Sequence, residues 1–251
     1  MSASRIRLFV KADLAPGAPV LLSAGQAHYL LHVMRLQAGD TVGVFNGRDG
    51  EWQASLDGTG KKNASLRIRE QARPQAPEPD LWLVFAPLKK ARMDMVVEKG
   101  TELGASVLWP VLTRNGDTTR INGERVRAQA AEAAEQCGRL TVPEVRDAVR
   151  LDALIRDWPR GRRLFVLDET GGGAPIADAF LAEREKPPSP HGLLVGPVGG
   201  FAPSELDALR KLDFATPIGL GPRILRAETA AVAALSCWQA LLGDWRSPKR
   251  L

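Results

Sequence analysis

The segment LLVGPVGGF at residues 193–201 and the segment PIGLGPRILRAETA at residues 217–230 decide how this sequence is interpreted. Each begins with a short apolar run that fits a buried strand and continues into a loop rich in glycine. A third loop of this kind, DETGGG at residues 168–173, follows the apolar run at residues 164–167. Glycine permits positive φ angles and lets the backbone approach a ligand closely, so these three loops indicate a binding site.

Around these loops, the second part of the chain alternates short apolar runs with stretches of helical spacing. Strands are predicted at residues 81–86, 107–111, 164–168, 193–196 and 217–221, and helices around 93–103, 122–137, 204–212 and 227–242. Asn122 and Pro203 favour helix starts, and Gly104, Gly138 and Gly243 favour helix ends. This alternation predicts an α/β fold with a mostly parallel sheet and helices on both of its sides.

In open α/β sheets, ligands bind beyond the carboxyl ends of the strands, which is where the three glycine-rich loops are predicted. The sequence has no Gly-x-Gly-x-x-Gly after a predicted strand and no Gly-Lys-Ser/Thr after a glycine loop. It also lacks the Gly-x-Ser-x-Gly turn that carries a nucleophilic serine. The loops therefore predict a ligand held by backbone groups and apolar walls rather than a phosphate cradle.

A smaller module precedes this part of the chain. Residues 1–75 carry ten Lys/Arg and six Asp/Glu, a charge of +4, whereas the other 176 residues carry 24 and 23, a charge of +1. Short alternating runs, with turn residues at 46–50, predict a small β-barrel-like module with one helix near residues 25–36. The proline-rich stretch 73–79 reads as a stiff linker, so we predict domains at 1–73 and 74–251. The basic excess favours contact with a polyanion, and random surface variation is the alternative.

Composition excludes several classes of protein. With 44% hydrophobic and 25% charged residues, the sequence is neither disordered nor collagen-like. It has no apolar run long enough to span a membrane and no apolar stretch typical of a signal peptide, so a cytoplasmic location is expected. Two cysteines and three histidines make metal-dependent chemistry improbable. His28 and His32 are expected to be structural or to face RNA, and His191 is expected at the surface.

The glycine-rich segments resemble the closing half of a SPOUT-class RNA methyltransferase and, more narrowly, the RsmE family. The resemblance extends to His28-Tyr29-Leu30, Val33-Met34-Arg35, Lys99-Gly100-Thr101-Glu102-Leu103-Gly104, Pro110, Arg114 and Glu135-Gln136-Cys137-Gly138-Arg139. It implies a trefoil-knotted SPOUT domain, an N-terminal PUA-like barrel, S-adenosylmethionine as the methyl donor, no metal, and a homodimer. The implied substrate is N3 of a uridine in the 16S ribosomal RNA of the small subunit. The family usually has Glu where this chain has Val198, which puts any polar role of that Glu in doubt.

The resemblance also suggests roles for single residues. The cofactor is expected at Leu194, Gly196, Pro197, Gly199, Gly200, Leu220, Gly221, Ile224, Leu225 and Thr229. A cation near the uracil oxygens would stabilise the anion that forms when N3 loses its proton. Arg226 is the first candidate for this cation, with Glu228 or Thr229 to orient it. Arg139 is the second candidate, and the other subunit could supply it. An ion pair in the first helical turn is the alternative interpretation of Arg226 and Glu228. RNA contacts are expected from Arg5, Arg7, Arg35 and Arg114, although each taken alone also fits a solvated surface charge.

Two other functions remain open from the sequence. One is an RNA-binding or ribosome-assembly protein with the same fold and no turnover. This alternative remains because the chain has Val198 where the family usually has Glu. The other is an α/β enzyme that acts on a small molecule, which the basic N-terminal module disfavours.

Overall fold

The computed structural model describes residues 6–58, 60, 64–116 and 120–246. The chain divides into two compact units. Unit 1 comprises residues 1–77 together with residues 134–142, and unit 2 comprises residues 78–133 and 143–251. Unit 1 is therefore built from two segments that lie far apart in the sequence.

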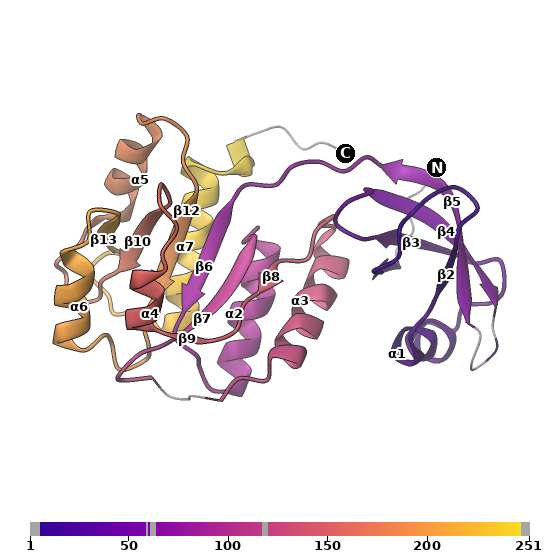
Figure 1. Ribbon diagram of the computed structural model, residues 1–251, viewed down its shortest axis with the longest axis horizontal. Coiled ribbons are helices and arrows are strands. Elements are labelled where there is room, and N and C mark those ends of the chain that lie inside the picture. Colours follow the sequence, from indigo (N-terminus) through magenta and orange to yellow (C-terminus); the bar gives the residue numbers. More distant parts are fainter. Residues whose placement is uncertain (1–5, 59, 61–63, 117–119, 247–251) are drawn as a thin grey trace. The chain divides into compact units, whose positions relative to one another are not determined.

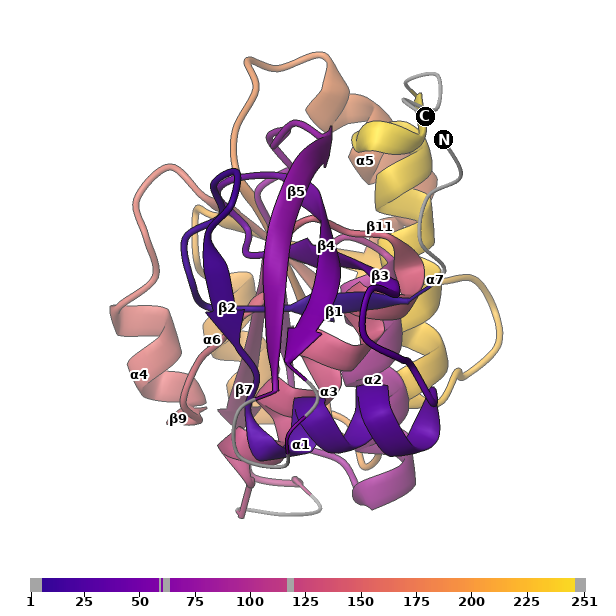
Figure 2. The same cartoon turned by 90° about the vertical axis from the view of Figure 1, so that its right-hand side faces the viewer.

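Unit 1 contains a five-stranded sheet in the order β1-β3-β4-β5-β2. Its strands are β1 (Arg7–Phe9), β2 (Pro19–Leu21), β3 (Thr41–Phe45), β4 (Glu51–Gly58) and β5 (Ser65–Arg73). The antiparallel hairpin of β3 and β4 confirms the turn predicted at residues 46–50, where Gly47 and Gly50 adopt positive φ. Figure 2 shows β4 and β5 side by side in this unit.

The helix predicted near residues 25–36 consists of two short elements, α1 (Ala24–His28) and the π-helical turn η1 (Tyr29–Val33). Ser23 caps α1 by accepting a hydrogen bond from the Gln26 N–H, while the Gln26 side chain accepts one from the Ser23 N–H. Leu30 of η1 is fully buried among the apolar residues of the sheet, whereas His28 and His32 are exposed, with ring centroids 5.1 Å apart. The segment thus has one face in the core of unit 1 and one face in solvent.

Unit 2 contains an eight-stranded sheet in which every strand pair is parallel. The path β11-β13-β10-β12-β6-β7-β8 connects seven strands, and β9 also pairs with β7. The strands are β6 (Leu81–Phe85), β7 (Val107–Leu112), β8 (Glu144–Val145), β9 (Val149–Arg150), β10 (Arg163–Leu167), β11 (Ala174–Pro175), β12 (His191–Val195) and β13 (Ala215–Gly219). This confirms the predicted α/β fold with a parallel sheet (Figure 1).

Helices cover both faces of this sheet, as the apolar runs in its strands require. The helices are α2 (Lys90–Glu102), α3 (Gly123–Cys137), α4 (Leu151–Arg156), α5 (Ile176–Arg184), α6 (Pro203–Arg210) and α7 (Ala227–Leu241), followed by the 3₁₀ turn η2 (Asp244–Arg246). Trp82, Val84 and Leu164 share one buried cluster with residues of α4 and α6. Phe165 points to the other face, where its ring packs edge to face with that of Phe180 of α5, with centroids 4.9 Å apart.

Three local signals place helix ends where the sequence predicts them. The Asn122 side chain caps α3 by accepting a hydrogen bond from the Arg125 N–H at 3.0 Å. Pro203 opens α6, and Gly104 and Gly138 adopt positive φ just beyond α2 and α3.

The sequence-based prediction of a surface position for His191 is wrong. This residue begins β12 and is 6% exposed, because its ring fills space between α5 and α7.

Candidate functional site

The three glycine-rich loops meet at one edge of the unit 2 sheet. Strands β13, β10 and β12 are neighbours and parallel, so their carboxyl ends lie side by side. The loops that follow them enclose a cavity of about 390 Å³, a size that suits a small organic ligand. The structure thus places the predicted loops around a single site.

Glycine shapes the cavity wall in two different ways. Gly221 has φ of +92°, and a Cβ added there would meet no protein atom within 4 Å, so it would point into open space. A Cβ on Gly196 would instead lie 2.8 Å from the Phe201 ring. Gly221 therefore leaves room at the cavity, whereas Gly196 makes room for a core side chain.

A buried carboxylate fixes the loop after β10. Asp168 accepts hydrogen bonds from the Thr170 hydroxyl at 2.6 Å, the Thr170 N–H at 2.9 Å and the Arg210 guanidinium at 2.7 Å. Burial alone would raise the pKa of Asp168, but the hydrogen bonds from Thr170 and Arg210 outweigh it and leave the pKa below its ordinary value. Asp168 is therefore a charged anchor for the loop that carries Glu169.

Most of the predicted cofactor residues line this cavity. They are Gly196, Pro197, Gly200, Leu220, Gly221, Ile224 and Leu225. Leu194, Gly199 and Thr229 lie outside its lining: Leu194 is fully buried in β12, Gly199 faces Asn115, and Thr229 is exposed on α7. The structure adds Asp168, Glu169 and Thr170, whose loop the sequence singled out without assigning its residues.

The three candidate catalytic residues occupy different places. Arg226 is exposed, lines the cavity and forms the N-cap of α7. Glu228 is 6% exposed and pairs with Arg92 of α2 at 3.5 Å, so the predicted orienting contact with Arg226 is replaced by one with another helix. Arg139 belongs to the 134–142 segment of unit 1. The side chain that the structure places at the cavity is thus Arg226.

The predicted RNA contacts also separate. Arg5 lies outside the described residues. Arg35 is exposed and has φ of +57°, a conformation that is uncommon for a residue with a side chain. Arg114 is exposed, and its N–H donates to Glu205 Oε1 at 2.9 Å.

Arg7 requires a correction. Its side chain is 10% exposed, it pairs with Glu51 at 3.1 Å, and its guanidinium donates to the carbonyls of Ala134, Glu135 and Arg139. The donors of this guanidinium are therefore used inside unit 1, and the expected phosphate contact does not fit this position. The sequence does not reveal this position, because an arginine that binds the end of a distant helix can have the same neighbours along the chain as a solvent-exposed arginine.

Among the described residues, no group of three or more His, Cys, Asp and Glu side chains is placed to hold a metal ion. The described helices also include none that combines the length and apolarity needed to cross a membrane.

The sequence matches two protein-family models and a set of related proteins. The family model of the RNA methyltransferase domain matches residues 75–239, and that of the RNA methyltransferase PUA domain matches residues 22–69. The chain is 31% identical to the ribosomal RNA small subunit methyltransferase E of Rickettsia conorii, over 92% of this chain and 93% of that protein.

Two solved structures share the fold over nearly the whole chain. A protein from Legionella pneumophila, solved in complex with the bound cofactor SAM, has a TM-score of 0.82 and 31% identity, covering 95% of this chain and 98% of that one. A ribosomal RNA small subunit methyltransferase E from Neisseria gonorrhoeae, bound to S-adenosyl methionine, has a TM-score of 0.83 and 24% identity. That match covers 96% of this chain and 100% of the other.

Proposed function

This chain belongs to the RNA methyltransferase family, and from that premise we propose that it transfers a methyl group from S-adenosylmethionine to small-subunit ribosomal RNA. The cavity at the carboxyl edge of the sheet carries the proposal, because its three loops combine backbone polar groups, apolar walls and two arginines at one place. The acceptor we infer is N3 of a uridine in 16S ribosomal RNA, as the resemblance to the RsmE family implies.

The residues of the cavity fit the cofactor. Leu220, Ile224 and Leu225 offer apolar surface for an adenine ring, and the open space beside Gly221 leaves room for the ligand. Glu169 lies in the lining and carries the negative charge that suits a cationic ligand. When bound, S-adenosylmethionine supplies an electrophilic methyl group, so the protein does not need a metal for this purpose.

Arg226 is the residue that we assign to the acceptor base. Its guanidinium would donate to the uracil oxygens and stabilise the negative charge that develops as N3 loses its proton. Its place at the start of α7 supports this role, because the positive end of the helix dipole acts in the same direction. Glu228 is buried against Arg92 and holds α7 to α2, so it positions the start of α7.

We further propose that unit 2 has the trefoil knot of the SPOUT class, that unit 1 closes as a PUA-like barrel, and that the protein is a cytoplasmic homodimer. Two apolar residues of the cavity lining support the homodimer, since Ile224 is 86% exposed and Val198 is 49% exposed. Arg35 is the RNA contact that we retain for unit 1, because it is exposed and its strained backbone fits a functional site.

The decisive experiment is mass spectrometry of ribosomal RNA from a strain that lacks this protein. We expect one 3-methyluridine to disappear from 16S ribosomal RNA and to return with the wild-type gene. An unchanged modification profile would contradict the proposed activity. If the protein still bound small subunits in that case, it would be an RNA-binding or ribosome-assembly protein without turnover, the alternative that Val198 suggests.

A further inference from the structure

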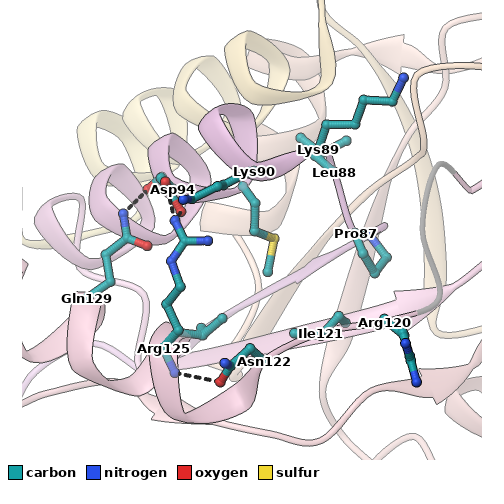
Figure 3. A pocket seen from close by; sticks show the side chains of 12 residues that line it. Pro87, Leu88, Lys89, Lys90, Asp94, Arg120, Ile121, Asn122, Arg125 and Gln129 are labelled. Carbon is teal, nitrogen blue, oxygen red and sulfur yellow. Dashed lines mark hydrogen bonds and ion pairs between the residues drawn. The ribbon is translucent and has the colours of Figure 1, made fainter.

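A second cavity, of about 420 Å³, lies at the start of α2 in unit 2 (Figure 3). Its apolar wall comes from Leu88, Met93 and Val126, which are buried, together with Pro87 and Ile121. Neither the cofactor loops nor the residues assigned to the acceptor base contribute to it. The cavity is therefore a separate feature with apolar surface to offer a ligand.

The rim of this cavity is cationic. Lys89, Lys90, Arg120 and Arg125 line it, and the carboxylate among the described lining residues is Asp94. Arg125 pairs with that carboxylate, and the described lining residues include no second carboxylate to match Lys89 and Lys90. The N-cap of α2 is Lys89, without a side-chain cap hydrogen bond, and the first turn has no acidic residue, so the helix dipole adds to this potential.

Hydrogen bonds between α2 and α3 hold the wall in place. Arg125 reaches across to Asp94, and Gln129 Nε2 donates to the Asp94 carbonyl at 2.9 Å (Figure 3). Asn122 Oδ1 accepts from the Arg125 N–H at 3.0 Å. These bonds use one end of each amide, so Asn122 Nδ2 remains a donor and Gln129 Oε1 remains an acceptor for the polar edge of a ligand.

The cavity opens at the same edge of the sheet as the cofactor loops. Strand β6 leads into Pro87 and Leu88 and is the direct neighbour of β12, whose last residue, Val195, lines the other cavity. The Ala86 N–H donates to the Val195 carbonyl at 3.0 Å, and Arg92 of α2 pairs with Glu228 of α7. The two cavities therefore follow neighbouring strands at one edge of the sheet, which favours contacts from a single RNA strand.

We propose that this cavity receives a nucleotide of the substrate RNA that flanks the methylated uridine. Its base lies against Leu88, Met93 and Val126, and its polar edge meets Asn122 and Gln129. Lys89 and Lys90 contact the adjoining phosphates. An apolar floor under a cationic rim suits an unstacked nucleotide, which is the form in which single-stranded RNA is recognised. The inference rests on the proposed function and adds to it a second RNA-binding site.

The test compares two double charge reversals of equal size in the full-length protein. Lys89→Glu/Lys90→Glu changes the cavity rim, whereas Arg160→Glu/Lys211→Glu changes two exposed residues of unit 2 outside both cavities. The substrate is small ribosomal subunits purified from a strain that lacks the protein. We expect the rim variant to raise KM for these subunits by about tenfold or more and to lower the salt dependence of binding, because two phosphate contacts are lost.

Affinity for S-adenosylmethionine, measured by calorimetry, should be unchanged in both double variants. Asn122→Asp is the second test, because Asp also caps a helix while the amide donor is lost. We expect this variant to fold normally and to bind the subunits more weakly. Equal KM values for the rim variant and its control, or an unchanged KM for a folded Asn122→Asp protein, would overturn the inference. Failure of the proposed function would differ, since the wild-type protein would then methylate no subunits.

Discussion

At the scale of single residues, two glycines shape the cavity at the carboxyl edge of the sheet in different ways. Gly221 combines a φ of +92° with open space beside its Cα, and Gly196 lies against Phe201. A substitution at Gly196 would therefore disturb the core as well as the site. The two glycines are not equivalent probes of cofactor binding, although both belong to glycine-rich loops.

We expect Gly221→Val to abolish S-adenosylmethionine binding while the protein stays folded, because the side chain would fill the ligand's space. The matched control is Gly161→Val, since Gly161 also has a positive φ, of +83°, and open space beside it but lies outside the cavity. Each change costs about 1–3 kcal/mol of backbone strain. Calorimetry with S-adenosylmethionine checks the prediction, and wild-type affinity in the folded Gly221 variant would contradict it.

The arginines of the cavity lead to a second prediction. Arg226→Ala should lower kcat about 100-fold or more with little change in S-adenosylmethionine affinity, because its guanidinium acts on the charge that develops on the acceptor base. Arg223→Ala is the control, since Arg223 is also exposed and lines the same cavity. Single-turnover methylation of small subunits measures the effect. Similar methylation rates for the Arg226 and Arg223 variants would contradict the proposed role of Arg226 at the acceptor base.

At the scale of secondary-structure elements, a buried polar cluster joins α5, β12 and α7. The Trp238 indole N–H donates to His191 Nδ1 at 3.2 Å, and His191 Nε2 lies 3.4 Å from Glu183 Oε1. Lys186 pairs with Glu183 at 2.7 Å, and Arg163 lies 4.0 Å from it. Burial lowers the pKa of His191 below its ordinary value, and the nearby Glu183 only partly opposes this effect. His191 therefore takes up a proton less readily in the folded protein than a solvent-exposed histidine does.

This cluster predicts how stability depends on pH. The unfolded chain takes up a proton at His191 more readily than the folded chain does, so the contribution of His191 is complete above pH 6.5 and falls as the pH drops below that value. The same proton would also remove the acceptor for the Trp238 N–H. Urea unfolding at pH 7.5 and 5.5 should show a smaller loss of stability for His191→Gln than for the wild type. Equal losses would contradict this prediction.

At the scale of the whole molecule, unit 1 is assembled across a long gap in the sequence. Arg7 and Arg73 both pair with Glu51, which is 2% exposed, and Arg73 donates to the Gly138 carbonyl at 2.8 Å. Phe45 packs with Ala134 and Leu140 in a small apolar cluster. Glu51 thus holds two arginines that donate to carbonyls of the 134–142 segment, and apolar packing adds to this attachment to the N-terminal sheet.

We expect Arg7→Met to destabilise the protein by about 3 kcal/mol, because it removes one partner of a buried ion pair and leaves three carbonyls without their donor. Arg67→Met is the matched control, since its pair with Asp57 is about half exposed and worth about 1 kcal/mol or less. Urea unfolding of the two variants checks the difference. A loss for Arg7→Met no larger than for Arg67→Met would contradict the structural role of Arg7.

The sequence by itself determined the parallel α/β sheet, the turn at residues 46–50, the helix ends at Asn122, Gly138 and Pro203, and the loops that surround the cavity at the carboxyl edge of the sheet. These features depend on neighbouring residues, through apolar runs, caps and glycine conformations. Sequence resemblance also pointed to the family.

The tertiary structure alone decided where Arg7, His191 and Glu228 lie: on the end of α3, between α5 and α7, and against Arg92. It also brought Leu88, Met93 and Val126 together at the start of α2. The physical reason is that a charged side chain has the same local pattern whether it is solvated or paired with a residue that is distant in the sequence. Its place depends on the path of the whole chain.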